Sequence, residues 1–323
     1  MLVPSRRRFC RLTLALPAWV ATAAQAAPSR RLTIGTAGLQ SDYHPIGVAV
    51  CRMVNASRKR HGLRCVAELS GGSVANIQGV ASGDVTLGLA QGDTLMAARE
   101  GTGPFAGKPQ PGLRSLCSLA TELFTIVVSS QAAIRAVEDL AGKRVSLGPP
   151  GSGTRATSDL VLAAHGLRAA DLAEVGELKF VELAAALCEH KIDAFMFVAG
   201  HPNPVFRDAI GACGARFVGI ADPRLDALVE GRPYYQRAWV PVDLYSGKDA
   251  AVATVATTAG FFTDASLPDD VAYAVTQAAL QNVGDLRRLH SMLAGLTLRD
   301  AARTTLPLHD GAAAYFRDAG VLP

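Results

Sequence analysis

Two short stretches rich in glycine and serine could bind an anion. They are Ser70-Gly71-Gly72-Ser73 and Gly151-Ser152-Gly153-Thr154-Arg155, and each lies between a predicted strand and a predicted helix. Such a loop leaves backbone N–H groups without partners at the positive end of the helix dipole. Both loops therefore predict anion binding. Arg155, in the first helical turn, opposes the dipole, and a bound anion would offset that cost.

The second loop, counted from Gly148, has the spacing of a phosphate-binding loop. Thr154, however, stands where that motif requires lysine. Without this lysine, and with no evident magnesium carboxylate, we expect a carboxylate ligand rather than nucleotide hydrolysis. A tight strand-to-helix turn with no ligand remains the structural alternative.

The first loop also permits an enzymatic interpretation. Gly71-Gly72-Ser73-Val74-Ala75 is close to a nucleophile elbow, with alanine in place of the last glycine. Ser73 would be the nucleophile of a secreted serine hydrolase, with His290 or His309 as its histidine. Because no HGGG-type oxyanion loop is present, we expect a binding protein that is not an enzyme and keep the hydrolase as the alternative.

Other polar residues follow predicted strand ends, where doubly wound sheets bind ligands. Thr36 and Gln91 are of this kind, and Tyr43 lies in a predicted polar loop. His44 and His201 flank the same predicted cleft. A metal site would need a third ligand such as Asp93 or Glu122, and no metal-binding spacing occurs. We therefore expect polar cleft residues and no metal or cofactor.

The predicted elements that hold these residues form two α/β lobes. Strands and helices alternate from 32 to 90 and again from 143 to 220, which is typical of parallel sheets. In detail, we predict a loop over 91–93 and a strand over 178–181. Strand-like segments at 116–129 and 253–263 would cross between the lobes and create a hinge and a cleft. The predicted boundaries are 27–120 for the first part of lobe 1, 121–250 for lobe 2, and 251–323 for the return to lobe 1 with the C-terminal helices.

The first 26 residues have the form of an export signal. A basic segment with Arg6, Arg7 and Arg8 precedes an apolar run and the cleavage-like Ala24-Gln25-Ala26. The order of the arginines fits a twin-arginine signal or a Sec signal. We expect cleavage near Ala26 and a periplasmic protein.

The composition is typical of a folded protein and agrees with the predicted export. Of the 323 residues, 49% are hydrophobic, and the formal charge of +4 comes from arginines in the signal. The mature chain then has no excess of basic residues, which disfavours nucleic acid as a partner. In an oxidising compartment, we expect disulfides Cys51–Cys65 and Cys188–Cys213, with Cys117 a buried free thiol.

Several stretches together resemble the TAXI family, the TRAP-associated extracytoplasmic immunogenic solute receptors. Each is weak alone, but they follow in order along the whole mature chain. They include Tyr43-His44-Pro45, Ser70-Gly71-Gly72-Ser73, Gly88-Leu89-Ala90-Gln91-Gly92-Asp93, Pro150-Gly151-Ser152-Gly153-Thr154-Arg155 and Gly200-His201-Pro202-Asn203-Pro204.

The resemblance implies a two-lobed α/β fold of the periplasmic-binding-protein type II class. It implies capture of a small organic anion, such as glutamate or a dicarboxylate, and delivery to a TRAP-type membrane permease; we expect a monomer. The altered loop Ala37–Asp42 departs from the family's glycine-rich run and puts the ligand's identity in doubt. With the observations above, the expected ligand-binding residues are Thr36, Tyr43, Gly72, Ser73, Asn76, Gln91, Asp93, Glu122, Ser152, Gly153, Thr154, Arg155 and His201.

Overall fold

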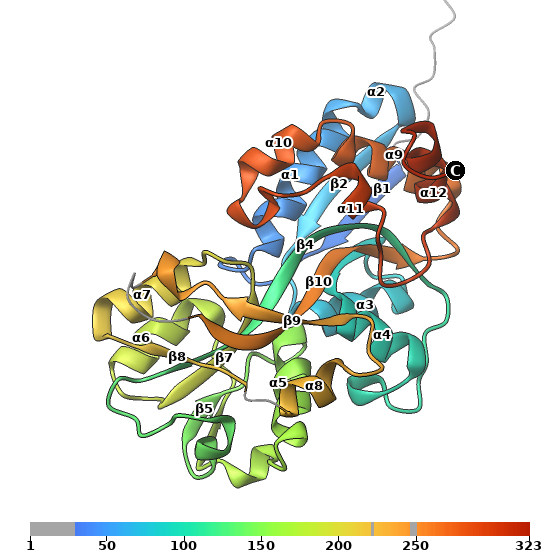
Figure 1. The fold of residues 1–323 in the computed structure, drawn as a ribbon. Coiled ribbons are helices and arrows are strands. Elements are labelled where there is room, and N and C mark those ends of the chain that lie inside the picture. The colour runs from blue at the N-terminus through green and yellow to red at the C-terminus, as the bar shows by residue number, and fades with distance from the viewer. Residues whose placement is uncertain (1–29, 221–222, 246–250) are drawn as a thin grey trace, which may run out of the picture.

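The structure is a computed structural model that describes residues 30–220, 223–245 and 251–323. The predicted export signal, including Ala26, lies outside the described residues. One ten-stranded sheet runs through the molecule in the order β2-β1-β3-β10-β4-β7-β5-β6, with β8 paired to β4 and β9 paired to β10. Figure 1 shows helices packed around both ends of this curled sheet.

The N-terminal strands confirm the predicted parallel arrangement. β1 (Arg30–Gly35) pairs in parallel with both β2 (Leu63–Glu68) and β3 (Leu87–Gln91). The helices that connect and follow them are α1 (Tyr43–Ala56), α2 (Arg58–His61), α3 (Ser73–Ser82) and α4 (Gly92–Glu100). Figure 1 shows them around the blue and teal strands.

Two long strands join the ends of the molecule. β4 (Leu113–Val128) and β10 (Val252–Asp264) run antiparallel side by side, as Figure 1 shows. β10 also pairs with β3, whereas β4 also pairs with β7. These are the expected crossing segments.

The middle of the chain builds the other end of the sheet. Its strands are β5 (Arg144–Ser146), β6 (Glu174–Gly176), β7 (Ala194–Ala199), β8 (Arg216–Val218) and β9 (Tyr235–Val240). Its helices are α5 (Gly153–Ala164), α6 (Leu183–Cys188), α7 (Pro204–Cys213) and α8 (Arg224–Val229). The chain ends in α9 (Asp269–Leu280), α10 (Val283–Leu289), α11 (Leu298–Ala301) and α12 (Asp310–Asp318).

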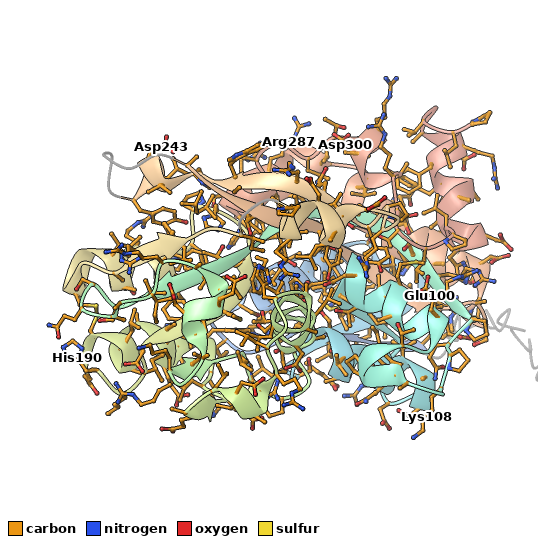
Figure 2. All side chains as sticks on the ribbon, turned by 60° about the horizontal axis from the view of Figure 1, so that its bottom comes forward. Glu100, Lys108, His190, Asp243, Arg287 and Asp300 are labelled. Atoms are coloured by element: carbon orange, nitrogen blue, oxygen red, sulfur yellow. A yellow bond between two sulfur atoms is a disulfide. The ribbon has the colours of Figure 1, made fainter. Side chains whose placement is uncertain are left out.

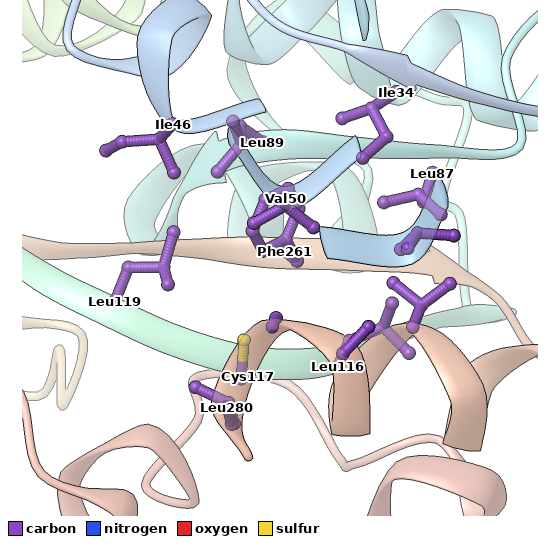
Figure 3. Packing of buried hydrophobic residues seen from close by; sticks show 14 of the residues in the cluster. Ile34, Ile46, Val50, Leu87, Leu89, Leu116, Cys117, Leu119, Phe261 and Leu280 are labelled. Carbon is purple, nitrogen blue, oxygen red and sulfur yellow. The ribbon is translucent and has the colours of Figure 1, made fainter. Parts of the chain in front are cut away.

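Buried side chains form separate cores on the two sides of the crossing strands. Two clusters draw on residues 32–119 and 259–316, and the part of the molecule around them is called lobe 1 below. Figure 3 shows Val50 and Phe261 in the centre of the larger one. Two further clusters draw on residues 124–255, and the part around them is called lobe 2. The domain boundaries drawn from the sequence stay a prediction.

Three local predictions were wrong. Residues 91–93 are not a loop, because α4 begins at Gly92 directly after β3. Likewise α1 begins at Tyr43, so this residue lies on a helix. The predicted strand at 178–181 is a 3-10 turn, Phe180–Glu182, in which the Glu182 side chain accepts a hydrogen bond from Lys179 N. The apolar residues at 178–181 favoured a buried strand, but in the structure Phe180 packs into the core while Val181 is exposed.

Both predicted disulfides are present. Cys51 is bonded to Cys65 and Cys188 to Cys213. Cys117 is a buried free thiol, and burial raises its pKa to about 12. Figure 3 shows it within the lobe 1 core.

Glu100, Lys108, His190 and Asp243 are exposed on the outside of the molecule, as Figure 2 shows. Within the described ranges, no helix is both long enough and apolar enough to cross a membrane.

Candidate functional site

The two glycine-rich loops meet across the boundary between the lobes. Ala75 N, in the first turn of α3, donates a hydrogen bond of 3.1 Å to the carbonyl of Gly151. A Cβ atom on Gly71 would lie 3.0 Å from the carbonyl oxygen of Pro150. Gly72 has a φ of 111°, which only glycine adopts readily. The approach of the lobes at this point therefore depends on glycine in the lobe 1 loop.

Both loops aim the N-terminus of a helix at one cavity. α3 begins at Ser73 and α5 at Gly153, and both residues line the cavity. The first N–H groups of a helix have no acceptor within that helix. Ser152 caps α5 by accepting a hydrogen bond from Arg155 N at 3.1 Å. The arrangement offers donors and positive helix-dipole ends from two lobes to a carboxylate.

The cavity is small in this form of the protein. The centre of a water molecule can occupy ≈ 30 Å³ of it, room for about two waters. The residues that line it come from both lobes and from the crossing strand β4: Ala37, Ser41, Asp42, Tyr43, Gly71, Gly72, Ser73, Gln91, Glu122, Ser152, Gly153, Thr154, Phe180, Phe197 and Val198.

Two carboxyl groups, those of Asp42 and Glu122, line this cavity. Tyr43 OH donates to Glu122 Oε2 at 3.0 Å, and burial, reinforced by the charge of Asp42, raises the pKa of Glu122 well above its usual range. Burial also raises the pKa of Asp42, although His290 beside it and the hydrogen bond from Gly200 N act in the opposite direction. None of the described residues that line the cavity is lysine, arginine or histidine.

Gln91 is a buried amide in the wall of the cavity. It is 3% exposed, and neither amide atom has a hydrogen-bond partner within the described part of the chain. A Cβ atom on Gly153 would lie 1.6 Å from Gln91 Oε1, so glycine at 153 makes room for this amide. A buried amide without partners costs free energy, and here it faces a cavity in which a ligand could satisfy it.

One wall of the cavity is aromatic. The rings of Phe180 and Phe197 are stacked with their centroids 4.1 Å apart. Both lie in lobe 2, and Phe197 on β7 also packs edge-on against Phe206. The wall therefore belongs to a rigid aromatic core.

Two of the expected ligand-binding residues instead brace the loops. Thr36 Oγ1 donates to Glu68 O at 2.6 Å. Asn76 Nδ2 donates to Thr36 O at 2.7 Å and to Leu89 O at 2.8 Å. Neither lines the cavity. They hold together the ends of β1, β3 and α3, from which the lining residues extend.

Asp93 also lies away from the cavity, on the first turn of α4. Its Oδ2 accepts hydrogen bonds from Thr157 Oγ1 at 2.7 Å and from Tyr235 OH at 2.6 Å. Oδ1 accepts from Thr94 N at 2.7 Å. Because Thr157 belongs to lobe 2, Asp93 bridges the two lobes.

The structure places Arg155 and His201, two of the expected ligand-binding residues, outside this cavity. Arg155 points outward, where it pairs with Asp159 at 3.0 Å and with Glu177 at 2.8 Å, and it lines a separate groove of ≈ 870 Å³. These acids neutralise the positive charge of Arg155, for which the sequence predicted a bound anion. His201 is partly buried and stacks on Phe206, and this partial burial lowers its pKa to about 4.

The structure thus brings eight of the predicted residues to one cavity: Tyr43, Gly72, Ser73, Gln91, Glu122, Ser152, Gly153 and Thr154. Seven further lining residues are not among the individually expected ones: Ala37, Ser41, Asp42, Gly71, Phe180, Phe197 and Val198. The sequence offered a reason to consider Asp42, because this residue adds an acidic group to the loop that departs from the TAXI pattern. The sequence offered no reason to place Phe180 and Phe197 at a binding site, because a buried aromatic residue is usually part of the hydrophobic core.

The geometry does not assemble a hydrolase. Ser73 Oγ accepts a hydrogen bond from Gln91 N at 3.1 Å. His290 lies beside Asp42 with 3.3 Å between Nε2 and Oδ1, and His309 caps α12 by accepting from Gly311 N. No hydrogen bond joins either histidine to Ser73 in the described part of the structure. Across the same residues, no group of three or more His, Cys, Asp or Glu side chains could hold a metal ion.

The chain is similar to several solved structures, and two of these, with TM-scores above 0.5, share its fold. A protein from Bordetella bronchiseptica RB50 shares 16% identity over 90% of this chain and 82% of its own, with a TM-score of 0.54. A periplasmic transporter shares 17% identity over 91% and 94%, with a TM-score of 0.53. The alkanesulfonate-binding protein SsuA from Xanthomonas axonopodis pv. citri, bound to MOPS, shares 17% over 92% and 96%, with a TM-score of 0.49.

The chain has the mixed α/β fold with a curled sheet that type II periplasmic binding proteins share, as the sequence predicted. Residues 34–320 match the family model of the NMT1-like family, and the chain belongs to that family. The hydrolase alternative finds no support in these comparisons.

Proposed function

We propose that this chain is an exported, monomeric receptor that captures a small organic acid between its lobes and delivers it to a TRAP-type membrane transporter. Glutamate-like amino acids, dicarboxylates and keto acids are the candidate solutes. The observation that carries the proposal is the meeting of the N-termini of α3 and α5, from different lobes, at one cavity. The transporter type rests on the resemblance to the TAXI family.

Binding would use the lining residues in distinct roles. Backbone N–H groups at Ser73 and Gly153 would hold a carboxylate, as helix N-termini do. Gln91 would satisfy its buried amide on the ligand. Because these groups belong to two lobes, a bound solute would favour the closed arrangement, and that form would dock on the membrane partner.

A thermal-shift screen of the mature protein tests solute binding. Amino acids, dicarboxylates and keto acids would be compared over a range of concentrations. A solute at about 100 times its Kd should add about 2.7 kcal/mol to the free energy of unfolding. A panel in which no compound shifts the melting temperature would overturn the proposal.

The matched variants are Gly153→Ala and Gly211→Ala. A methyl group at 153 collides with Gln91, whereas one at 211 meets open space. We expect the first to lose the ligand-induced shift and the second to keep it.

The membrane partner needs its own test. Immobilised receptor with bound solute would be used to capture detergent-solubilised membrane proteins, which mass spectrometry then identifies. We expect a TRAP-type permease that is retained only with solute present. Retention of the permease of an ATP-driven transporter would contradict this part of the proposal.

A further inference from the structure

Building on the proposed function, we propose that Glu122 binds the solute in its protonated form, as a hydrogen-bond donor to the solute's carboxylate. The site then holds an anionic acid together with one proton. The solute's carboxylate oxygens act as acceptors, and the proton stays on Glu122 or is shared along this hydrogen bond. Such a site binds a carboxylate without a basic side chain.

The surroundings of Glu122 are the first argument. This residue lies on the crossing strand β4, is 3% exposed and lines the cavity. Its Oε2 accepts a hydrogen bond of 3.0 Å from Tyr43 OH, and its Oε1 has no hydrogen-bond partner among the described residues. A buried carboxylate needs a cation or several donors to keep its charge. Glu122 has one neutral phenol, so the protonated form is favoured.

The titratable groups that face Glu122 include no cation. They are Tyr43 at the start of α1, Asp42 just before that helix, and Asp93 on α4. Burial, reinforced by the charges of Asp42 and Asp93, raises the pKa of Glu122 well above its usual range. The neighbours of Glu122 on three segments therefore act in the same direction as its burial.

Asp42 is less suited to this role, because both of its carboxyl oxygens have partners. Oδ2 accepts a hydrogen bond of 3.1 Å from Gly200 N, and Oδ1 lies 3.3 Å from His290 Nε2. His290 does not line the cavity. Of the two acids in the wall, Glu122 is the one with a carboxyl oxygen left for a ligand.

The charge balance of the site is the second argument. Each helix N-terminus is equivalent to about half a positive charge, so the ends of α3 and α5 together offset about one carboxylate, that of the solute. None of the described residues that line the cavity is lysine, arginine or histidine. No charge remains to stabilise a second carboxylate at Glu122, and two like charges at low dielectric constant repel strongly. A proton on Glu122 removes this repulsion and supplies a donor.

A protonated Glu122 also completes a set of donors. Ser73 and Gly153 begin α3 and α5, and Gln91 Nε2 has no acceptor among the described residues. The ideal Cβ position on Gly153 is 2.7 Å from Ser73 Oγ. Tyr43 neighbours both Ser73 and Glu122. A carboxylate has about four sites that accept hydrogen bonds, so the donors of these residues match one carboxylate group.

Infrared difference spectroscopy tests the protonation state directly. Mature protein at pH 7 would be saturated in turn with glutamate, succinate and 2-oxoglutarate. Each spectrum would be compared with that of the Glu122→Gln variant in the same solution. With the best-bound compound, we expect the carbonyl band of a protonated carboxylic acid, and we expect Glu122→Gln to lack it. A complex without that band would overturn the inference.

Titration calorimetry with the same three compounds tests the donor role. Glu122→Gln keeps a neutral donor and should lose less than about tenfold in affinity. Glu122→Leu removes the donor and should bind about 10- to 100-fold more weakly, the range for a hydrogen bond to a charged group. Glu100→Gln, an exposed change in the separate groove, should leave affinity unchanged. Circular dichroism would verify that each variant is folded.

The outcomes separate the two proposals. A loss of more than tenfold in Glu122→Gln would show that binding needs the charged carboxylate. Full affinity in Glu122→Leu would remove Glu122 from the ligand site. Either result refutes the inference and leaves the proposed receptor function standing. Absence of binding by all three compounds and by the whole thermal-shift panel would overturn the receptor function itself.

Discussion

Thr157 and Asp93 connect the two lobes: Thr157 Oγ1 on α5 donates to Asp93 Oδ2 on α4 across 2.7 Å. Both side chains are buried, and Tyr235 OH reaches the same carboxylate oxygen. The sequence placed Asp93 among the ligand-binding residues. In the structure Asp93 accepts hydrogen bonds from protein hydroxyl groups and from the backbone of Thr94, so it holds the two lobes together.

Thr157→Val should weaken solute binding without touching the cavity. The change removes one hydrogen bond to a carboxylate, a loss of about 1.5–3 kcal/mol, from the closed form. Thr157→Ser keeps the hydroxyl group and is the matched control. Titration calorimetry would measure affinity, and the radius of gyration from small-angle scattering would report closure. Identical affinity in the Val and Ser variants would show that this contact does not couple the lobes.

Glu122→Gln should change how stability depends on pH. Burial raises the pKa of Glu122 above its ordinary value of 4.5, so the folded state binds this proton more tightly than the unfolded state does. Stability therefore falls as pH rises from about 4.5 towards the raised pKa. Gln cannot ionise, so the variant should lack this loss, with an advantage that grows as pH rises from about 4.5 towards the raised pKa.

Chemical denaturation at several pH values checks this, with Glu100→Gln as the exposed control. A Glu122→Gln variant that is less stable than the original at pH 8, with the two equal at pH 4, would contradict the assignment. That pattern would mean that the carboxylate is stabilised in its charged form.

Gln91→Met should stabilise the ligand-free protein and weaken its binding of solute. Methionine fills similar space without an amide, so the variant removes two buried polar atoms that lack partners in the described structure. We expect the ligand-free protein to gain about 1–3 kcal/mol and to bind solute at least about tenfold more weakly. Denaturation and calorimetry on the same preparation test both parts. Lower stability with full affinity would place the amide in the structural framework and outside the ligand site.

Much of the fold followed from local patterns. The helix that the sequence predicts after the first glycine-rich loop is α3, because apolar residues at helical spacing precede Gly83, which ends the helix in a left-handed conformation. The cysteine pairs followed from short separations in a chain with a predicted export signal. The order of strands and helices indicated parallel pairing, which β1, β2 and β3 show.

The site was less predictable, because its character depends on contacts between distant segments. Nothing local to Phe180 and Phe197 distinguishes a cavity wall from a core. The direction of Arg155 is set by Asp159 one turn later and by Glu177 on a separate loop. The glycine and serine residues of the two loops were enough to predict that helix N-termini lie at the site. Which side chains face the cavity depends on the partners of each side chain, and these come from distant segments.

Arg155→Ala is the sharpest test of that difference. The sequence alone predicts a loss of about 1–3 kcal/mol in binding an acidic ligand, the range for a charge-assisted hydrogen bond. The structure predicts unchanged affinity, since the guanidinium pairs with Asp159 and Glu177 and lines another groove. Because both partner acids are about half exposed, losing these ion pairs should lower stability by about 1 kcal/mol or less. Calorimetry and denaturation would be run beside Asp159→Asn, which removes one of the same pairs without removing the cation. A tenfold loss of affinity in Arg155→Ala alone would return this arginine to the binding site.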